Sequence, residues 1–185
     1  KAEEIIKEEL QRARPGFGLI LEESGKEVGR DKEDFWIVDP LDGTMNFLHG
    51  LPHFAISIAH ESEGEILSGI IFDPLRNEIF YSVKGRGAYS NDGRIRVSNR
   101  KELNDSVFST GIPCIGKDRH PAYLKILDDM MKRSAGIRRF GAASLDLAYV
   151  AAGRYEGFWE TDLKYWDVAA GSLLVQEAGG YISGI

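Results

Sequence analysis

The alternation of hydrophobic and polar residues between positions 54 and 97 constrains the fold more than any other feature of the sequence. Two turn-forming segments interrupt it, Asp-Pro-Leu-Arg-Asn at 73–77 and Asn-Asp-Gly at 91–93. Strands of alternating character that are joined by short turns pair as antiparallel hairpins. The region therefore predicts an antiparallel meander that supplies most of one sheet.

The pattern changes after about residue 100, where short apolar strands alternate with segments of helical spacing. We expect strands at 106–110 and 137–140 and helices at 119–133, 142–152 and 168–178. Such an alternation is typical of α/β proteins. The sequence therefore predicts the α/β class, with a smaller α/β lobe after the meander.

The two ends of the chain are simpler to interpret. We expect, in chain order, a helix at 2–13, a strand at 17–21, a polar loop at 25–34, a strand at 35–38 and the start of a final strand at 179–183. Pro15 should end the first helix. The Asp39-Pro40 pair should end the strand before it, because proline cannot donate a ladder hydrogen bond.

Length and composition favour one compact domain over residues 1–185, because 43% of the residues are hydrophobic and can form a substantial core. The sequence lacks an initiator Met and begins inside a helical pattern. It also ends inside the last expected strand. We therefore expect N-terminal helical and C-terminal segments to be missing.

The charge and composition argue against several classes of partner. A formal net charge of −6 and the lack of a dense Lys or Arg stripe disfavour direct binding of nucleic acid. No apolar run is long enough to span a membrane. Cys114 is the only cysteine, so no intrachain disulfide can form, and a cytoplasmic setting is expected. The histidine spacings match no zinc motif.

An apolar strand runs directly into two acidic residues, Asp39 and Asp42. Acids at the end of a strand are held rigidly, and hard cations such as Mg²⁺ prefer oxygen ligands. The two carboxylates can both point at one site, and the carbonyls of the turn between them can add a neutral ligand. Because Asp, Pro and Gly also serve ordinary β-turns, a purely structural turn is the alternative.

Gly43 and Thr44 come next and predict a phosphate-binding helix start. Their backbone N–H groups would open a short helix at 45–48, and the start of a helix binds phosphate oxygens well. The Thr44 hydroxyl can also orient a metal-bound water for attack. A plain helix N-cap is the alternative role for Thr44.

Two more acidic residues, Glu22 and Asp167, are candidates for the same site. Glu22, with Glu23 beside it, ends the strand predicted at 17–21, so two adjacent strands can bring it to Asp39. Asp167 precedes an apolar helix and can face inward from its start. The alternatives are a solvated turn carboxylate for Glu22 and a helix N-cap for Asp167.

Four other residues are candidates for binding an organic substrate. Glu160 can accept hydrogen bonds from the hydroxyl groups of a polyol. The small residues Gly141, Ala142 and Ala143 begin a predicted helix and can leave room for a ring. The alternatives are an exposed strand end for Glu160 and helix packing for the small residues.

Three separated motifs resemble those of the inositol monophosphatase-like family of Mg²⁺-dependent, lithium-sensitive phosphatases. They are LEES at 21–24, WIVDPLDGT at 36–44, and WDVAAG at 166–171 together with EAGG at 177–180. Their order and spacing agree across all 185 residues. The resemblance implies a layered α+β sandwich with two sheets, assembled as a homodimer, that acts on a small-molecule phosphomonoester.

The resemblance also implies roles for individual residues. A first Mg²⁺ would be held by Glu22, Asp39 and the carbonyl of Leu41, and a second by Asp39, Asp42 and Asp167. Glu22 and Thr44 would orient the attacking water. The substrate would be bound by Asp42, Gly43, Thr44, Gly141, Ala142, Ala143 and Glu160.

The implied reaction is in-line attack of water on the phosphomonoester, without a covalent intermediate. In the family, an Asp on the preceding helix pairs with the motif threonine; it would fall upstream of Lys1, so the general-base relay is incomplete in this sequence. Residues 45–50 and Glu160 resemble the inositol-phosphate branch. The alternatives are fructose bisphosphate or another sugar phosphate as substrate, a binding partner of transcription or ribosome-assembly machinery, and a metal-binding scaffold without turnover.

Overall fold

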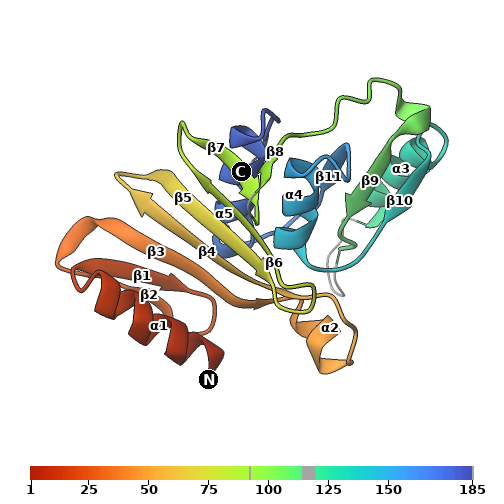
Figure 1. The fold of residues 1–185 in the computed structure, drawn as a ribbon. Helices are drawn as coiled ribbons and strands as arrows, with labels where there is room; N and C mark the ends of the chain where they lie inside the picture. The colour runs from red at the N-terminus through yellow and green to blue at the C-terminus, as the bar shows by residue number, and fades with distance from the viewer. Residues whose placement is uncertain (92, 114–119, 185) are drawn as a thin grey trace.

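The structure is a computed structural model that describes residues 1–91, 93–113 and 120–184 (Figure 1). The larger of its two sheets has eight strands in the order β2-β1-β3-β4-β5-β6-β7-β8, and the smaller has three in the order β10-β9-β11. Helices lie between the sheets and on their outer sides (Figure 1). This layered, mixed arrangement confirms the predicted fold class.

The bounds of the elements follow the sequence pattern closely. The larger sheet contains β1 (Phe17–Leu21), β2 (Gly25–Glu27), β3 (Asp31–Asp42), β4 (Ala55–Ser62), β5 (Glu65–Asp73), β6 (Glu78–Val83), β7 (Gly87–Ser90) and β8 (Gly93–Ile95). The smaller sheet contains β9 (Val107–Thr110), β10 (Gly136–Arg138) and β11 (Gly157–Trp159). The helices are α1 (Ala2–Ala13), α2 (Thr44–Leu48), α3 (His120–Met131), α4 (Ala143–Ala151) and α5 (Tyr165–Glu177), with a 3₁₀ turn η1 (Leu103–Asp105).

The predicted meander is confirmed, because each strand from β4 to β8 pairs antiparallel with the next. The predicted turn at 73–77 joins β5 to β6. There the buried carboxylate of Asp73 accepts the backbone N–H groups of Leu75 (3.0 Å) and Arg76 (3.1 Å). The turn at 91–93 includes Asp92, which lies outside the described residues, but Ser90 and Gly93 on either side are paired.

The smaller α/β lobe is also confirmed. Its strands β9, β10 and β11 are parallel, as an alternation of strands and helices predicts. The second of them covers 136–138 rather than the expected 137–140. Cys114 lies outside the described residues. Within the described part of the chain, no helix is long and apolar enough to cross a membrane.

The polar loop predicted at 25–34 is wrong. Residues Gly25–Glu27 form β2, which pairs antiparallel with β1, and β3 already begins at Asp31. The sequence pattern did not indicate β2 or the first residues of β3, because most side chains there are exposed and a strand is recognised in sequence by its buried hydrophobic face. The edge strand β2 is held by backbone hydrogen bonds instead.

Two other expectations about strand ends are wrong. β3 does not stop at Pro40 but continues to Asp42, with an irregular register against β4 between Asp39 and Asp42 that accommodates the missing N–H of proline. No strand follows α5 within the described residues 179–184. Instead Gly179, with φ of +92°, takes the left-handed conformation that ends the helix.

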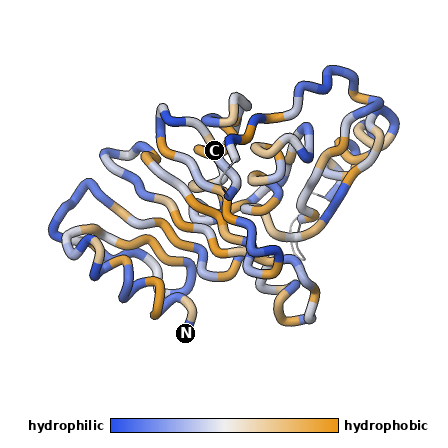
Figure 2. The backbone as a smooth tube through the Cα atoms, viewed as in Figure 1, coloured by the Kyte–Doolittle hydropathy of each residue, from blue (hydrophilic) through white to orange (hydrophobic). Residues whose placement is uncertain are grey.

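The core lies between the two sheets, where α4 and α5 pack together. Every residue of α4 is buried, and so is the 169–175 segment of α5. A helix that is hydrophobic on all sides is stable only when it is enclosed. Figure 2 shows the same segregation, with hydrophobic stretches in the central strands and hydrophilic ones at many of the turns. Trp166, in the first turn of α5, packs against this core.

A close approach between β5 and α5 gives the first prediction. A Cβ atom on Gly69 would lie 2.8 Å from Cα of Ala170 and 3.0 Å from its carbonyl oxygen, so Gly69→Ala must push the helix away from the sheet. We expect the free energy of unfolding to fall by about 1–3 kcal/mol in chemical denaturation.

Gly93→Ala is the matched control, because its Cβ would meet only the carbonyl oxygen of Ser90, at 3.5 Å. It should leave the free energy of unfolding unchanged within about 0.5 kcal/mol. Equal losses in the two variants would contradict the packing argument.

Candidate active site

The carboxyl end of β3 carries Asp39 and Asp42, and the neighbouring strand β1 brings Glu22 to the same edge. β1 and β3 are parallel, with Leu21 opposite Val38. The backbone N–H of Glu22 donates to the carbonyl of Val38 at 3.2 Å. Parallel strands end at the same edge of a sheet, so the expected meeting of Glu22 and Asp39 is confirmed.

Asp39 has the turn role that was the alternative to a functional one, but it is also deeply buried. Its Oδ1 accepts the backbone N–H of Leu41 at 2.9 Å, and the side chain is 2% exposed. The hydroxyl of Thr44 donates to the carbonyl of Leu41 at 2.9 Å. The turn is therefore internally bonded, as is the turn at the buried Asp73. Asp73, however, pairs with the guanidinium of Arg76, whereas the charged neighbours of Asp39 are the carboxylates of Asp42 and Glu22.

Asp42 joins the larger sheet to the start of α4. Its Oδ2 accepts the backbone N–H of Ser144 at 2.8 Å and also the Ser144 hydroxyl. The structure thus brings the 141–143 segment to Asp42, but Ala142 and Ala143 are buried, as the helix-packing alternative requires. Ser144 was missed as a site residue; its polar side chain at an otherwise apolar helix start was the available signal.

The start of α2 lies beside the same segment. Gly43 is the N-cap, so the N-cap alternative for Thr44 is wrong, and Thr44 is the first helical residue. The side chain of Asn46 donates to the carbonyls of His53 (2.8 Å) and Phe140 (2.7 Å). Asn46 was also missed, and it fixes α2 against the chain that leads into α4.

Asp167 lies within the first turn of α5 and not before it. The helix starts at Tyr165 with Lys164 as N-cap, so the alternative N-cap role for Asp167 is wrong. Its Oδ2 accepts the backbone N–H of Lys164 at 2.7 Å, which is the bond of the third residue of a capping box. The carboxylate therefore stabilises the helix start, and its charge also raises the pKa of Asp42.

The carboxylates raise one another's pKa. Burial raises the pKa of Asp39 most, and Asp42 and Glu22 raise it further. Burial raises the pKa of Asp42 to about 6, against the hydrogen bonds from Ser144, which lower it. The pKa of Asp167 is also raised, first by burial and then by Glu22. Ionising these carboxyl groups together at the end of β3 therefore costs free energy, and a bound cation would relieve that cost.

Two further acidic residues extend this cluster towards the smaller sheet. Burial, and after it the charge of Asp42, raises the pKa of Glu160 to about 7. Its carboxylate packs against Gly111, where a Cβ atom would lie 1.8 Å from Cδ of Glu160. Asp146 on α4 is 1% exposed, and burial raises its pKa to about 8. Asp146 was missed, although an acid inside an apolar helix is a recognisable signal.

The donor chemistry fits a hard divalent cation, but the side chains are not arranged as a finished cage. Four carboxylates from Glu22, Asp39, Asp42 and Asp167 act on one another electrostatically, and oxygen is the ligand that Mg²⁺ prefers. Within the described residues, no three His, Cys, Asp or Glu side chains surround a single point closely enough to hold a metal. Binding therefore requires the side chains to turn inward.

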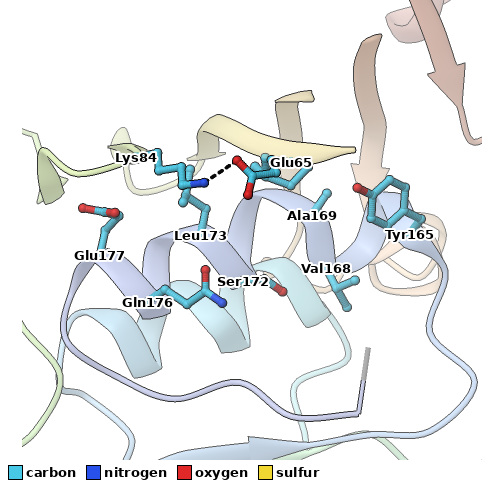
Figure 3. A pocket seen from close by; sticks show the side chains of 10 residues that line it. Glu65, Lys84, Tyr165, Val168, Ala169, Ser172, Leu173, Gln176 and Glu177 are labelled. Atoms are coloured by element: carbon cyan, nitrogen blue, oxygen red, sulfur yellow. Dashed lines mark hydrogen bonds and ion pairs between the residues drawn. The ribbon is translucent and has the colours of Figure 1, made fainter. Parts of the chain in front are cut away.

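A surface groove on the described part of the chain lies away from these carboxylates. A groove of about 330 Å³ runs beside α5, lined in part by Glu65, Lys84, Tyr165 and Glu177 (Figure 3). Lys84 and Glu65 pair across it at 2.5 Å, which matches their charges. The unmatched carboxylates are at the end of β3, and we place the candidate site there.

The fold and the acidic centre define a layered α/β protein with carboxylates gathered beside a helix start. The model of the inositol monophosphatase family matches residues 1–185. This chain belongs to that family. Members of the family are generally metal-dependent.

Individual relatives carry two kinds of name. The chain is 56% identical over 181 residues to an inositol-1-monophosphatase of Rhizobium meliloti, covering 98% of this chain and 68% of the relative. It is 48% identical over 181 residues to a Nus factor SuhB of Xylella fastidiosa, covering 98% and 65%. The solved extragenic suppressor protein suhB of Bartonella henselae is similar with a TM-score of 0.94 at 54% identity, covering 96% of this chain and 68% of that one.

The raised pKa of Asp146 predicts a specific dependence of stability on pH. Its folded-state pKa of about 8 exceeds the ordinary value of 3.8, so the stability it contributes is complete below about pH 4 and is lost as the pH rises towards 8. Asn has the same shape and stays neutral. In chemical denaturation without metal, Asp146→Asn should match the wild type near pH 4 and exceed it at pH 9, on the order of several kcal/mol.

The control for this measurement is Asp128→Asn on α3, an exposed carboxylate that pairs with Lys132 at the surface. It should follow the wild-type pH profile with only a small offset. Parallel profiles for wild type and Asp146→Asn would mean that Asp146 titrates normally.

Proposed function

We propose that this protein is a Mg²⁺-dependent phosphomonoester hydrolase acting on inositol monophosphate or a related sugar or polyol phosphate. The observation that carries the proposal is the buried pair Asp39 and Asp42 at the end of β3, directly before the start of α2. Glu22 and Asp167 add their charge to that pair. Membership of the inositol monophosphatase family supports the same reaction class.

The cation would be held by the carboxylates of Glu22, Asp39, Asp42 and Asp167 and by the carbonyl of Leu41. When bound, Mg²⁺ would neutralise these acids and the phosphate charge and would acidify an attacking water. The Leu41 carbonyl already accepts one hydrogen bond from Thr44, and a carbonyl oxygen has a second lone pair for a ligand.

The phosphate would bind at Gly43 and Thr44. The first intrahelical bond of α2 runs from the N–H of Phe47 to the carbonyl of Gly43 at 3.0 Å. The N–H groups that precede Phe47 therefore have no partner inside the helix and can meet phosphate oxygens. Gly43, with φ of +86°, takes a conformation that other residues adopt only with strain.

Thr44 and Glu22 would act on the attacking water. The Thr44 hydroxyl donates its proton to the Leu41 carbonyl, so the hydroxyl oxygen can accept a hydrogen bond from the water and orient it in line with the phosphorus. The carboxylate of Glu22, the residue directly after β1, would take the proton that the water loses. A bond from the water oxygen to phosphorus would form as the ester P–O bond breaks. The proton taken by Glu22 would be returned to the leaving oxygen, directly or through water, so the products are the alcohol and inorganic phosphate and no covalent intermediate is required.

The part of the site that selects the alcohol would lie between α4 and β11. Glu160 would accept hydrogen bonds from hydroxyl groups of the leaving alcohol. The charge of Asp42 raises the pKa of Glu160, which supports placing the two carboxylates in one site. Gly141, Ala142 and Ala143 would limit the size of the ring by their small volume. Fructose 1,6-bisphosphate is the alternative substrate, and a comparison of kcat/KM for the two compounds separates them.

Phosphate release from inositol 1-phosphate and fructose 1,6-bisphosphate, titrated with Mg²⁺ and reversed by EDTA, is the direct test. We expect Mg²⁺-dependent release by the wild type and a loss of about 100-fold or more in kcat/KM for Asp42→Asn, with weaker Mg²⁺ binding, because Asp42 would help to hold the cation that neutralises the phosphate. The remote Asp128→Asn variant should behave as the wild type. Unchanged Mg²⁺ affinity in Asp42→Asn would contradict the assignment of Asp42.

A second function is favoured by the relatives that are named Nus factor SuhB. In that case the protein acts mainly as a binding partner of transcription machinery, and its acidic centre is dispensable for growth. Asp39→Asn, tested for complementation of a deletion strain, separates the two functions. We expect loss of complementation if hydrolysis is the main role, and retained complementation by a folded, inactive variant would establish the binding role instead.

Two further implications of the resemblance stay predictions. Li⁺ should inhibit by occupying a cation position, and the protein should form a homodimer. The apolar side chains of Met45, Phe47, Leu48 and Leu51 are exposed on and after α2, which supports an interface there.

A further inference from the structure

Glu3 is an unusual residue for the surface helix that carries it. α1 is amphipathic, and its other acidic residues, Glu4, Glu8 and Glu9, are exposed, whereas Glu3 is only 4% exposed. A buried carboxylate is costly unless it accepts hydrogen bonds. The partners of Glu3 therefore indicate what this side chain does.

Both partners lie in the turn that follows β1. Oε2 of Glu3 accepts the backbone N–H of Glu23 at 2.9 Å, and Oε1 accepts the hydroxyl of Ser24. These two residues come directly after Glu22. The carboxylate of Glu3 thus holds the turn through two adjacent residues, across 20 and 21 positions of sequence.

The contacts fix the backbone on both sides of Glu22. The N–H of Glu22 is bonded to the carbonyl of Val38 on β3, and the next N–H, that of Glu23, is bonded to Glu3. With both peptide planes held, the direction in which the Glu22 side chain leaves the backbone is set. The side chain itself is exposed, so its direction depends on these backbone bonds more than on packing.

We propose that Glu3 is a positioning residue for Glu22, holding the turn so that the Glu22 carboxylate is presented to Asp39 and to a cation bound there. The proposal rests on the proposed function. Groups that orient the ligands of a metal usually affect its affinity about 10–100-fold, because a ligand that must first be ordered binds more weakly.

A second contact from the same helix supplies a matched control. Lys7 pairs with Glu27 at 2.5 Å and so ties α1 to β2, the strand after the turn. Lys7→Met breaks a connection between α1 and the same hairpin but leaves the turn beside Glu22 alone. If Glu3 only anchored the helix, the two substitutions would have the same consequences.

The experiment is a calorimetric titration of the full-length protein with Mg²⁺ alone, without substrate. We expect Glu3→Leu to weaken Mg²⁺ binding by about tenfold or more and Lys7→Met to leave it unchanged within about twofold. Glu3→Gln should restore most of the affinity, because its carbonyl can accept from Glu23 while its amide donates to the Ser24 hydroxyl. Denaturation curves check that every variant is folded.

Ser24→Ala removes one of the two bonds and serves if Glu3→Leu does not fold; it should weaken Mg²⁺ binding about two- to fivefold. Amide hydrogen exchange provides a readout without metal. The Glu23 amide should be protected in the wild type and in Glu3→Gln, and unprotected in Glu3→Leu.

The outcomes separate this inference from the proposed function. Wild-type Mg²⁺ affinity in folded Glu3→Leu, or an equal loss in Lys7→Met, would overturn the positioning role while leaving the hydrolase proposal intact. A wild-type protein that binds no Mg²⁺ would overturn the hydrolase proposal itself.

Discussion

The pairing of β3 with β1 on one side and with β4 on the other is the constraint on which the rest of the site depends. The parallel β1 pairing brings Glu22 to the edge where Asp39 emerges, and the irregular β4 pairing lets β3 continue past Pro40 to Asp42. A regular ladder would point alternate residues to opposite faces of the sheet. The irregularity instead turns the chain so that both aspartates, three positions apart, belong to one site.

The free-energy cost of ionising several buried carboxyl groups explains why this site needs strong support from the rest of the fold. Asp39, Asp42 and Asp167 all have raised pKa values, chiefly through burial, so ionising them costs folding free energy. The core between the sheets compensates for it. α4 and α5 are buried there over most of their length, and each contributes a polar residue to the site, Ser144 at the start of α4 and Asp167 at the start of α5.

Much of this architecture follows from local sequence pattern. The β4–β8 meander, α1, β1 and the three later helices could be predicted because their buried faces repeat with the period of a strand or helix. β2 could not, because an edge strand such as Gly25–Glu27 is specified by backbone pairing with β1. The extension of β3 past Pro40 was hidden for a related reason: only the partner strand shows that the ladder can skip the residue that lacks an N–H.

The site was predictable where a motif placed acids at the end of a strand, as for Asp39, Asp42 and Glu22. Residues whose role depends on a contact distant in sequence were not. Ser144 meets Asp42 across 102 positions, and Asn46 meets Phe140 across 94. The sequence around each residue does not indicate its partner, so these contacts can be identified only from the folded structure.

A hydrogen bond from a backbone N–H to a carboxylate recurs among the acids of this site, and the same kind of bond connects α1 to the site. Asp39, Asp42 and Asp167 each accept a backbone N–H, from Leu41, Ser144 and Lys164 respectively. A carboxylate can accept about four hydrogen bonds, so one backbone donor fixes its plane and leaves most of its capacity for a ligand. Glu22 differs because its side chain is exposed and it is held through its own main chain. The carboxylate of Glu3 accepts the backbone N–H of Glu23, the residue after Glu22. Glu3 thereby orients Glu22 through the main chain, whereas each aspartate is oriented by a hydrogen bond to its own carboxylate.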